Sequence, residues 1–395
     1  MKRTFGKPLT VAIHWPRFGP YHLARLNAAF HKFQTRGLRV VGLETASQDQ
    51  TYEWREVKEA TDFERCIVFP GRVYESISWL EMWQGVNRLL TKINPTVIAV
   101  NGYSTSDAWA AIAWARMRDC PVVLMSETKR DDAPRSIVKE AAKRIIVRQF
   151  RAALCGGTPH RAYLKELGMR AECIFLGYDA VDNQYFSCGA EHARQNPSSF
   201  YHLPGLEPDA HFFLASARFI RRKNMVGLLE AYCQYRQMAK ERELKAPWRL
   251  VVLGDGEERD DLEKLIQIKH VEGVTLAGFR QIHELPAYYG LARVFIHPAV
   301  QEQWGLVVNE AMASGLPVLV SERCGCVQNL VQEGKNGFAF DPENTTLLAE
   351  LMHRCSSGQV DLSMFGYASK KIISSWGPER FAQGLFMTIQ SSKPI

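Results

Sequence analysis

The sequence predicts an α/β protein made of two doubly wound domains, each built on a parallel sheet. Its 395 residues are about twice the usual length of one domain. Short β-branched runs alternate with longer amphipathic stretches along most of the chain, which is the pattern of parallel strands covered by helices. Residues 182–209, which are rich in turn-forming types, interrupt this alternation, so we expect the domain boundary there.

The first series of elements forms the expected N-terminal domain, residues 1–185. Its apolar and β-branched runs predict buried strands, and apolar residues at helical spacing separate them. The predicted strands are residues 10–14, 39–43, 66–69, 96–100 and 121–125, and the predicted helices are residues 21–34, 106–118 and 135–150.

The second series forms the expected C-terminal domain, residues 210–375, and leaves residues 186–209 as a linker. Its predicted strands are residues 212–217, 249–253, 274–276, 294–296 and 317–320, and its predicted helices are residues 225–241, 257–270, 284–290 and 306–314. One more amphipathic stretch, residues 381–389, predicts a final helix with Trp376 and Phe381 as packing anchors.

Composition excludes several classes of protein. Hydrophobic residues make up 46% and charged residues 23% of the chain, which is ordinary for a globular protein and argues against a disordered or fibrous one. No apolar run approaches the ~20 residues that a membrane span needs. The apolar stretch after the basic first eight residues is too short for a signal peptide and is typical of a strand, so we expect a cytoplasmic protein.

The nine cysteines are scattered, and several lie in apolar stretches, so we expect buried, reduced thiols. Cys324 and Cys326 are the one close pair. No second pair and no histidine stands at metal-ligand spacing from them, so we expect no metal site.

Charge is distributed unevenly along the chain. Residues 1–180 contain 27 Lys and Arg against 18 Asp and Glu, and the rest contains 22 against 24, which suggests different partners for the two halves. The predicted helix at 135–150 is amphipathic and basic, which is typical of a contact with anionic lipid at the cytoplasmic face of a membrane. It is equally typical of a surface helix in a basic protein. No nucleic-acid-binding module is present, so we expect no nucleic-acid partner.

Two carboxylates follow the strand predicted at 294–296. Glu302 lies in the loop, and Glu310, separated from it by seven residues, lies in the first turns of the next helix. Ligands of such sheets bind at the carboxyl ends of strands, where carboxylates suit the hydroxyls of a sugar or ribose. The backbone N–H groups of Trp304, Gly305 and Leu306 suit a phosphate or sugar oxygen. The alternative is two solvated glutamates at an ordinary helix N-terminus.

A basic turn follows the strand predicted at 212–217. It contains Arg218, Arg221, Arg222 and Lys223. Guanidinium forks and an ammonium group at a strand end suit a diphosphate, and Arg218 and Lys223 are close enough to converge on one. The alternative is a solvated basic turn.

Glycines follow the next two strands. Gly254 and Gly256 come after the strand at 249–253, and Gly278, followed by Phe279 and Arg280, comes after the next one. Glycine lets the backbone approach a ligand closely, and the second turn suits a flat base. Each signal is weak by itself.

Five short motifs together resemble the nucleotide-sugar domain of retaining glycosyltransferases with the GT-B fold, in glycosyltransferase family 4 (glycosyl transferases group 1). The matching positions are Arg218 with Lys223, 254–256, 277–279, Glu302 with Glu310, and Gly325 with 334–338. Their order and spacing are far more specific than any one motif. The resemblance is close over about a third of the chain. It implies two Rossmann-like domains facing a cleft, with a C-terminal helix at 376–395 that returns to the first domain.

The resemblance also implies roles for these residues. Arg218 and Lys223 would bind the donor diphosphate and stabilise the departing nucleotide, and Glu302 would hold the donor sugar; these three are the expected catalytic residues. Other residues would bind the rest of the donor: the ribose at Glu310, and the sugar, phosphates and base at Gly254, Gly278, Phe279, Arg280, Trp304, Gly305 and Leu306.

The implied activity is a metal-independent, retaining transfer of a sugar from a nucleotide-diphospho-sugar, UDP favoured over GDP or ADP, to a hydroxyl acceptor. Such a reaction belongs to glycan, lipopolysaccharide, glycolipid or glycosylated-metabolite biosynthesis. The donor is a substrate, so no cofactor is expected. A GT-B sugar-nucleotide epimerase, a phosphorylase and a non-catalytic, membrane-associated relative are the alternatives.

The first domain resembles the family only in outline. There Gly19 would approach the donor phosphates, and His22, Tyr103 and Glu127 would lie on the acceptor side. Glu127 stands where many relatives have a histidine near the donor sugar. The alternatives are a surface position for His22 and core packing for Tyr103. In the second domain, Cys326 and Asn329 replace a glycine and a glutamate that are common in relatives.

Overall fold

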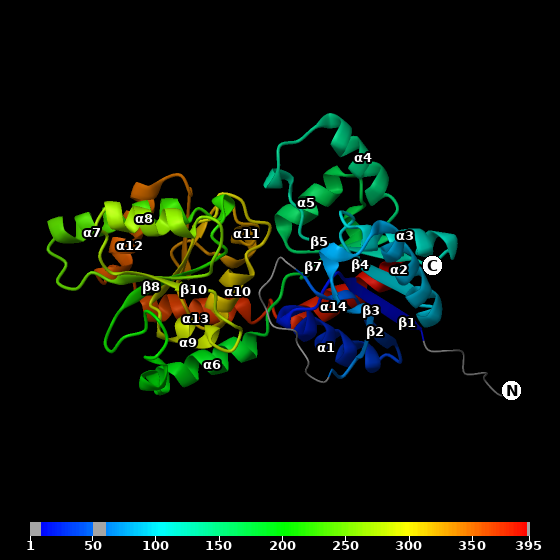
Figure 1. The fold of residues 1–395 in the computed structure, drawn as a ribbon, viewed down its shortest axis with the longest axis horizontal. Coiled ribbons are helices and arrows are strands. Elements are labelled where there is room, and N and C mark those ends of the chain that lie inside the picture. Colours follow the sequence, from blue (N-terminus) through cyan, green and yellow to red (C-terminus); the bar gives the residue numbers. More distant parts are fainter. Residues whose placement is uncertain (1–8, 50–60, 393–395) are drawn as a thin grey trace. The chain divides into compact units, whose positions relative to one another are not determined.

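The computed structural model describes residues 9–49 and 61–392, so the basic first eight residues lie outside the described part. The chain divides into two compact units, one of Met1–Val181 with Trp376–Ile395 and one of Asp182–Ser375 (Figure 1). Each unit contains a parallel β-sheet covered by helices, so the predicted α/β class is confirmed.

The first unit has a seven-stranded sheet with the order β3-β2-β1-β4-β5-β6-β7. Its strands are β1 (Thr10–Trp15), β2 (Arg39–Gln48), β3 (Glu64–Val73), β4 (Val97–Asn101), β5 (Val122–Ser126), β6 (Ala152–Cys155) and β7 (Ile174–Leu176). Its helices are α1 (Pro20–Gln34), α2 (Trp79–Ile93), α3 (Ser106–Met117), α4 (Ile137–Val147), α5 (Thr158–Glu166) and α14 (Pro378–Ser392). The five predicted strands are confirmed, and β6 and β7 were not predicted.

The second unit has a six-stranded sheet with the order β10-β9-β8-β11-β12-β13. Its strands are β8 (Phe212–Ser216), β9 (Arg249–Leu253), β10 (Val274–Gly278), β11 (Val294–His297), β12 (Val318–Ser321) and β13 (Gly337–Phe340). Its helices are α6 (Asn183–Gln195), α7 (Met225–Glu241), α8 (Arg259–Ile268), α9 (Leu285–Leu291), α10 (Leu306–Ala313), α11 (Val327–Leu330), α12 (Thr345–Ser356) and α13 (Leu362–Ile373). The strand order reverses between β8 and β11, which is where ligands bind in sheets of this type.

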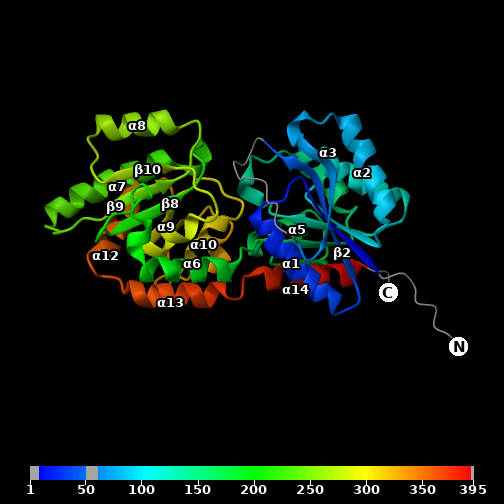
Figure 2. The same ribbon diagram turned by 60° about the horizontal axis from the view of Figure 1, so that its bottom comes forward.

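Helix α6 occupies part of the linker expected at 186–209, and it belongs to the second unit. It packs against α9, and the two helices lie side by side in both ribbon views (Figures 1 and 2). The ring of Phe186 meets that of Tyr289 edge-on, with centroids 5.9 Å apart. Gly290 permits the approach, because a Cβ there would lie 2.6 Å from the carbonyl oxygen of Ala190. The expected linker is therefore, in its first part, a packed helix.

The last helix, α14, belongs to the first unit. It packs against α1 and β6, and it lies beside α1 in both views (Figures 1 and 2). Phe381 and Leu385 are buried in the core of this unit, and the guanidinium of Arg380 lies 3.9 Å from the ring centre of buried Trp376. The end of the chain therefore contributes a layer to the unit formed by its beginning.

Candidate functional site

An ionic cluster lies at the carboxyl edge of the second sheet, where the strand order reverses. Lys223, in the basic turn after β8, forms a salt bridge with Glu302, in the loop after β11, and Nζ donates a hydrogen bond to Oε2. The same oxygen accepts a hydrogen bond from Nε2 of His297, at 3.1 Å. The exposed fractions of these side chains are 14% for Lys223, 10% for Glu302 and 1% for His297. Two of the three predicted catalytic residues thus meet in one partly covered site.

The cluster favours charged forms of its members. Burial by itself raises the pKa of Glu302, but Lys223 and His297 hold it well below its usual range. Burial likewise lowers the pKa of His297, whereas Cys324 and Glu302 raise it, and the balance brings it to about 9. At neutral pH the site therefore contains a carboxylate between two cations.

The backbone position of Lys223 is held by the contacts of the next residue, Asn224. Asn224 has a left-handed backbone, with φ of 58°, and its side-chain amide donates to the carbonyl oxygens of Pro298 (3.2 Å) and Pro342 (2.9 Å). The backbone N–H of Val300 donates to the carbonyl oxygen of Arg222 at 3.0 Å. The basic turn and the loop before Glu302 are therefore joined directly, which explains why the two side chains converge.

The loop that carries Glu302 is held from the other side by residues 324–326. The N–H of Gly325 donates to the carbonyl oxygen of Glu302, and that of Cys326 to the carbonyl oxygen of Trp304, each at 3.2 Å. Gly305 has φ of 99°, and a Cβ there would lie 3.0 Å from Cys324 Sγ and 3.6 Å from His297 Nε2. Glycine at this position leaves the space that the cluster occupies.

Helix α10 begins directly beside the cluster. Gly305 is its N-cap and Leu306 its first residue, so the predicted backbone donors lie at a helix N-terminus. The indole of buried Trp304 donates to Asn309 Oδ1 at 2.9 Å, which ties the loop to the helix. Glu310 is also buried, and its Oε2 accepts a hydrogen bond from the hydroxyl of Tyr289 at 2.7 Å.

Arg218, the third predicted catalytic residue, is exposed at the end of β8. The Gly-Asp-Gly turn supports it. A Cβ at Gly254 would lie 1.8 Å from the carbonyl oxygen of Ala217, and the N–H of Phe219 donates to the carbonyl oxygen of Asp255 at 2.8 Å. The glycines therefore have a packing role, since they let the turn pack against the backbone that carries Arg218.

The third turn of the site follows β10. The N–H of Gly254 donates to the carbonyl oxygen of Gly278 at 2.9 Å, so the two glycine turns are adjacent. Arg280 donates to the carbonyl oxygen of Ala277 and pairs with Glu284 at 3.1 Å. Phe279 is half-buried beside it. The geometry places this turn next to the Gly-Asp-Gly turn, and its contact with a base stays a prediction.

The predicted residues of the first unit are spread over the carboxyl ends of its strands. The N–H of Gly19 donates to Nδ1 of His22 at 3.0 Å, and the His22 ring packs on Trp15, with centroids 4.9 Å apart. Burial, followed by Arg25 and Arg17, lowers the pKa of His22 to about 3, so the ring is neutral. His22 is thus a partly buried residue that interacts with the N-terminus of α1.

Two further predicted residues have different surroundings. The ring of Tyr103 packs against that of Phe150, with centroids 6.3 Å apart, and contacts the core, as the packing alternative predicts. Glu127 is half-buried after β5, and its charge contributes, after burial, to raising the pKa of Tyr178. Acceptor binding by either residue stays a prediction.

Sequence reasoning missed several members of two polar clusters. One is His297 with Cys324, beside Glu302. The other is buried at the carboxyl edge of the first sheet, where His14 Nε2 lies 3.3 Å from Asp107 Oδ2 and Thr45 donates to the same oxygen at 2.8 Å. In a single sequence, a histidine within a strand looks the same whether it belongs to a polar cluster or packs in the core.

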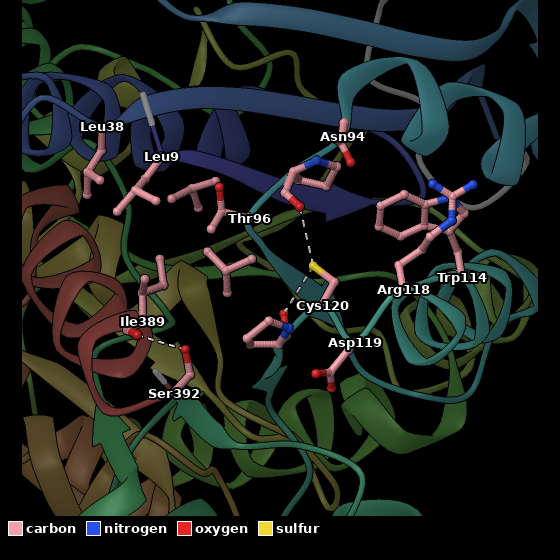
Figure 3. Close-up of a pocket in the computed structure, with 14 residues that line it drawn as sticks. Leu9, Leu38, Asn94, Thr96, Trp114, Arg118, Asp119, Cys120, Ile389 and Ser392 are labelled. Atoms are coloured by element: carbon pink, nitrogen blue, oxygen red, sulfur yellow. Dashed lines mark hydrogen bonds between the residues drawn. The ribbon is translucent and has the colours of Figure 1, made fainter. Parts of the chain in front are cut away.

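A cavity of about 480 Å³ lies in the first unit (Figure 3). It is lined at the start of β1 by Leu9 and Val11, before β4 by Thr96, and before β5 by Cys120. These positions precede the strands or lie at their beginning, so the cavity lies at the amino edge of the sheet, opposite the edge where ligands bind in such folds.

Within residues 9–49 and 61–392, no three His, Cys, Asp or Glu side chains are grouped so that they could hold a metal ion. Over the same residues, none of the helices has both the length and the apolar character needed to cross a membrane.

Comparisons with known proteins find similarity over most of the second unit. Residues 204–372 match the family model Glycosyl transferases group 1. The sulfoquinovosyl transferase SQD2 of Arabidopsis thaliana is 40% identical over 112 residues, which are 27% of this chain and 21% of that protein. The alpha-monoglucosyldiacylglycerol synthase of Acholeplasma laidlawii is 29% identical over 150 residues, which are 38% of this chain and 36% of that protein. The matched regions are thus about a third of the Acholeplasma protein and about a fifth of the Arabidopsis protein.

Solved structures resemble the chain over nearly its whole length. A glycosyltransferase from Rickettsia africae ESF-5 matches with a TM-score of 0.73 and 12% identity, over 99% of this chain and all of that one. Anabaena Alr3699/HepE in complex with UDP and glucose matches with a TM-score of 0.70 and 17% identity, over 97% of this chain and all of that one. The chain has the two Rossmann-like sheets of the GT-B fold. The match of residues 204–372 supports an assignment of this region to the family Glycosyl transferases group 1.

Proposed function

We propose that this protein is a metal-independent, retaining glycosyltransferase that moves a sugar from a nucleotide-diphospho-sugar to a hydroxyl acceptor. The observation that carries the proposal is the contact between Lys223 and Glu302 at the switch point of the second sheet. It brings a phosphate-binding type of side chain and a hydroxyl-binding type into one site, within a region that matches a glycosyltransferase family. The Anabaena structure of similar fold holds UDP and glucose, which supports a UDP-sugar donor.

The chemistry follows from where charge develops. Cleavage of the bond between the anomeric carbon and the diphosphate leaves negative charge on the nucleotide, and preorganised cations lower the energy of that state. Lys223 and Arg218 serve this purpose. Glu302 accepts hydrogen bonds from hydroxyls of the donor sugar and orients its ring. The acceptor oxygen then bonds to the anomeric carbon on the face that the nucleotide leaves, and its proton passes to the departing phosphate.

A donor screen tests the proposal. UDP-, GDP- and ADP-sugars are added to the purified protein, and the melting temperature is measured, because a ligand that binds only the folded state raises it. We expect the largest rise with a UDP-sugar. Release of free UDP that depends on added acceptor separates transfer from epimerisation, and its independence of inorganic phosphate excludes a phosphorylase. A protein that binds none of the three donor classes would instead be the non-catalytic alternative.

The acceptor side has a feature that favours a membrane surface. Helix α4 exposes Ile137, Val138 and Ile145, with exposed fractions of 90%, 77% and 63%. At about 100° per residue these three lie on one face, and the exposed Arg144 and Arg148 flank it. Apolar side chains beside arginines suit a membrane interface that contains anionic lipid. We therefore propose an acceptor at such a surface, and the similarity to an alpha-monoglucosyldiacylglycerol synthase, whose name includes a diacylglycerol, supports this.

Vesicle flotation tests the surface. We expect the protein to float with vesicles containing phosphatidylglycerol and to stay behind with pure phosphatidylcholine. The double variant Ile137→Ser, Ile145→Ser loses flotation. Ile268→Ser, at a 75% exposed isoleucine of α8 in the other unit, is the matched control and keeps it. Equal flotation of both variants would show that α4 is an ordinary surface helix.

A further inference from the structure

Glu302 has two partners on one oxygen in the structure. Lys223 and His297 both donate to Oε2, one from the turn after β8 and the other from the last residue of β11. The two partners differ in mobility. Lys223 reaches the carboxylate through a long, flexible side chain, whereas His297 is part of a strand and is 1% exposed.

Donor binding gives Lys223 and His297 different roles. Under the proposed function, the ammonium group of Lys223 turns to the diphosphate. Glu302 must then stay ionised and oriented for the sugar while Lys223 interacts with both the diphosphate and Glu302. A buried carboxylate that loses its partner is strongly destabilised. The contact from His297 does not depend on the position of Lys223, so the imidazole can hold the carboxylate throughout.

The surroundings of His297 fit this role. Its Nδ1 is buried and has no hydrogen-bond partner among the described residues, and the ring interacts with Cys324 in addition to its hydrogen bond to Glu302. Gly305, which carries no side chain, and the buried thiol of Cys324 leave space for the ring at the carboxylate. On the other side His297 lies nearly parallel to Phe295, with ring centroids 6.5 Å apart. The strand and these contacts fix the direction of Nε2.

We propose that His297 is a positioning residue, which holds the Glu302 carboxylate toward the donor sugar after Lys223 has engaged the diphosphate. This inference rests on the proposed function. It predicts that His297 affects the sugar part of the donor and not the nucleotide part, because its contact is with Glu302.

Two substitutions test this. His297→Leu removes the hydrogen-bond donor of the side chain, and His297→Gln keeps a side-chain N–H that can reach the carboxylate. We expect kcat to fall about 10- to 100-fold in the leucine variant and to recover to within about fivefold of the parent in the glutamine variant. The Kd for UDP, measured calorimetrically, changes less than twofold in both. His211→Gln, at an exposed histidine of the same unit, is the control and keeps kcat.

Several results would overturn the inference. They are an unchanged kcat in His297→Leu, a parallel loss of UDP binding that points to general damage, and a glutamine variant as poor as the leucine one. A second measurement needs no turnover: in Glu302→Gln the imidazole of His297, followed by NMR, should titrate at lower pH than in the parent. An unshifted titration would show that the two groups are not coupled. If the parent protein binds no nucleotide sugar while this shift is present, the contact is real but the proposed function has failed.

Discussion

Lys223 and Glu302 are 79 positions apart in the sequence and form a salt bridge at the edge of one sheet. The parallel topology places their turns side by side, and Asn224 links them through its two hydrogen bonds. Each charge is thus neutralised by the other. Under the proposed function, donor binding exchanges one set of charged contacts for another, which avoids leaving either charge buried and unpaired.

Lys223→Ala and Glu302→Gln should each lower kcat by about 100- to 1,000-fold, because each removes a group that acts where charge develops or the sugar is held. Initial rates with a saturating donor measure this, and circular dichroism checks the fold. Lys264→Ala, at an exposed lysine of α8, keeps full activity. Full turnover by both site variants would refute the assignment.

Asn224 allows backbone geometry and hydrogen bonding to be separated. Asn224→Ala removes both hydrogen bonds and replaces asparagine, which tolerates the left-handed conformation, by alanine, which tolerates it less, so we expect a loss of about 2–4 kcal/mol in the free energy of unfolding. Asn224→Gly removes the bonds but accepts the conformation, and about 1–3 kcal/mol should be lost. Urea titration measures both values. Equal stability of the two variants would show that the backbone conformation costs nothing here.

Gly305→Ala should disturb the ionic cluster directly. The new Cβ would meet Cys324 Sγ at 3.0 Å in addition to a strained φ of 99°, so we expect both lower stability and lower kcat. Gly334→Ala is the matched control, because Gly334 also has a positive φ, 69°, but nothing lies within 4 Å of its Cβ position. The control should cost about 1–2 kcal/mol of stability and leave kcat unchanged. A similar kcat in both variants would mean that the space beside Glu302 is not needed.

Stability should depend on pH through His297. Its pKa is raised in the folded protein to about 9 from an unfolded value of about 6.5. The folded state therefore binds the proton more tightly, and this contribution is complete below pH ~6.5 and is lost as the pH rises through about 9. The unfolding free energy of the parent, relative to that of His297→Gln, should thus fall between these pH values. A difference that is independent of pH would contradict a charged imidazole.

Phe186→Ala tests whether α6 is part of the second unit. Phe186 is buried against Tyr289, so its truncation should cost about 3–5 kcal/mol. Gln184→Ala, on the exposed side of α6, should change stability by less than about 0.5 kcal/mol. Thermal unfolding followed by calorimetry measures both. A mild effect of Phe186→Ala would mean that this helix behaves as a linker after all.

Much of the fold follows from the sequence, because long buried strands have a strong pattern of β-branched residues. The strand predicted at 10–14 is an example. Strand β6 was missed because its Ala-Ala-Leu-Cys run resembles a buried helix, and β13 because glycine begins it. Helix α6 was hidden by its small and polar residues and by the Asn-Pro that follows it.

The site was predictable where its chemistry lies in exposed turns at strand ends. That reasoning, together with the family resemblance, assigned Lys223 and Glu302 to one site. It did not find His297, because a histidine that ends a buried strand differs from core packing only through the loop that folds over it. It also gave Gly254 a ligand role, although a closely packed carbonyl of Ala217 already requires glycine there.

The chain passes from the first unit to the second at Val181 and returns at Trp376. The second unit, residues 182–375, is consequently one uninterrupted segment that lies between the two segments of the first. The first unit, by contrast, is discontinuous, and a stop codon after Ser375 would remove α14 from it while sparing every residue of the ionic cluster. Truncation at the C-terminus should therefore destabilise the first unit, which consists mainly of N-terminal residues.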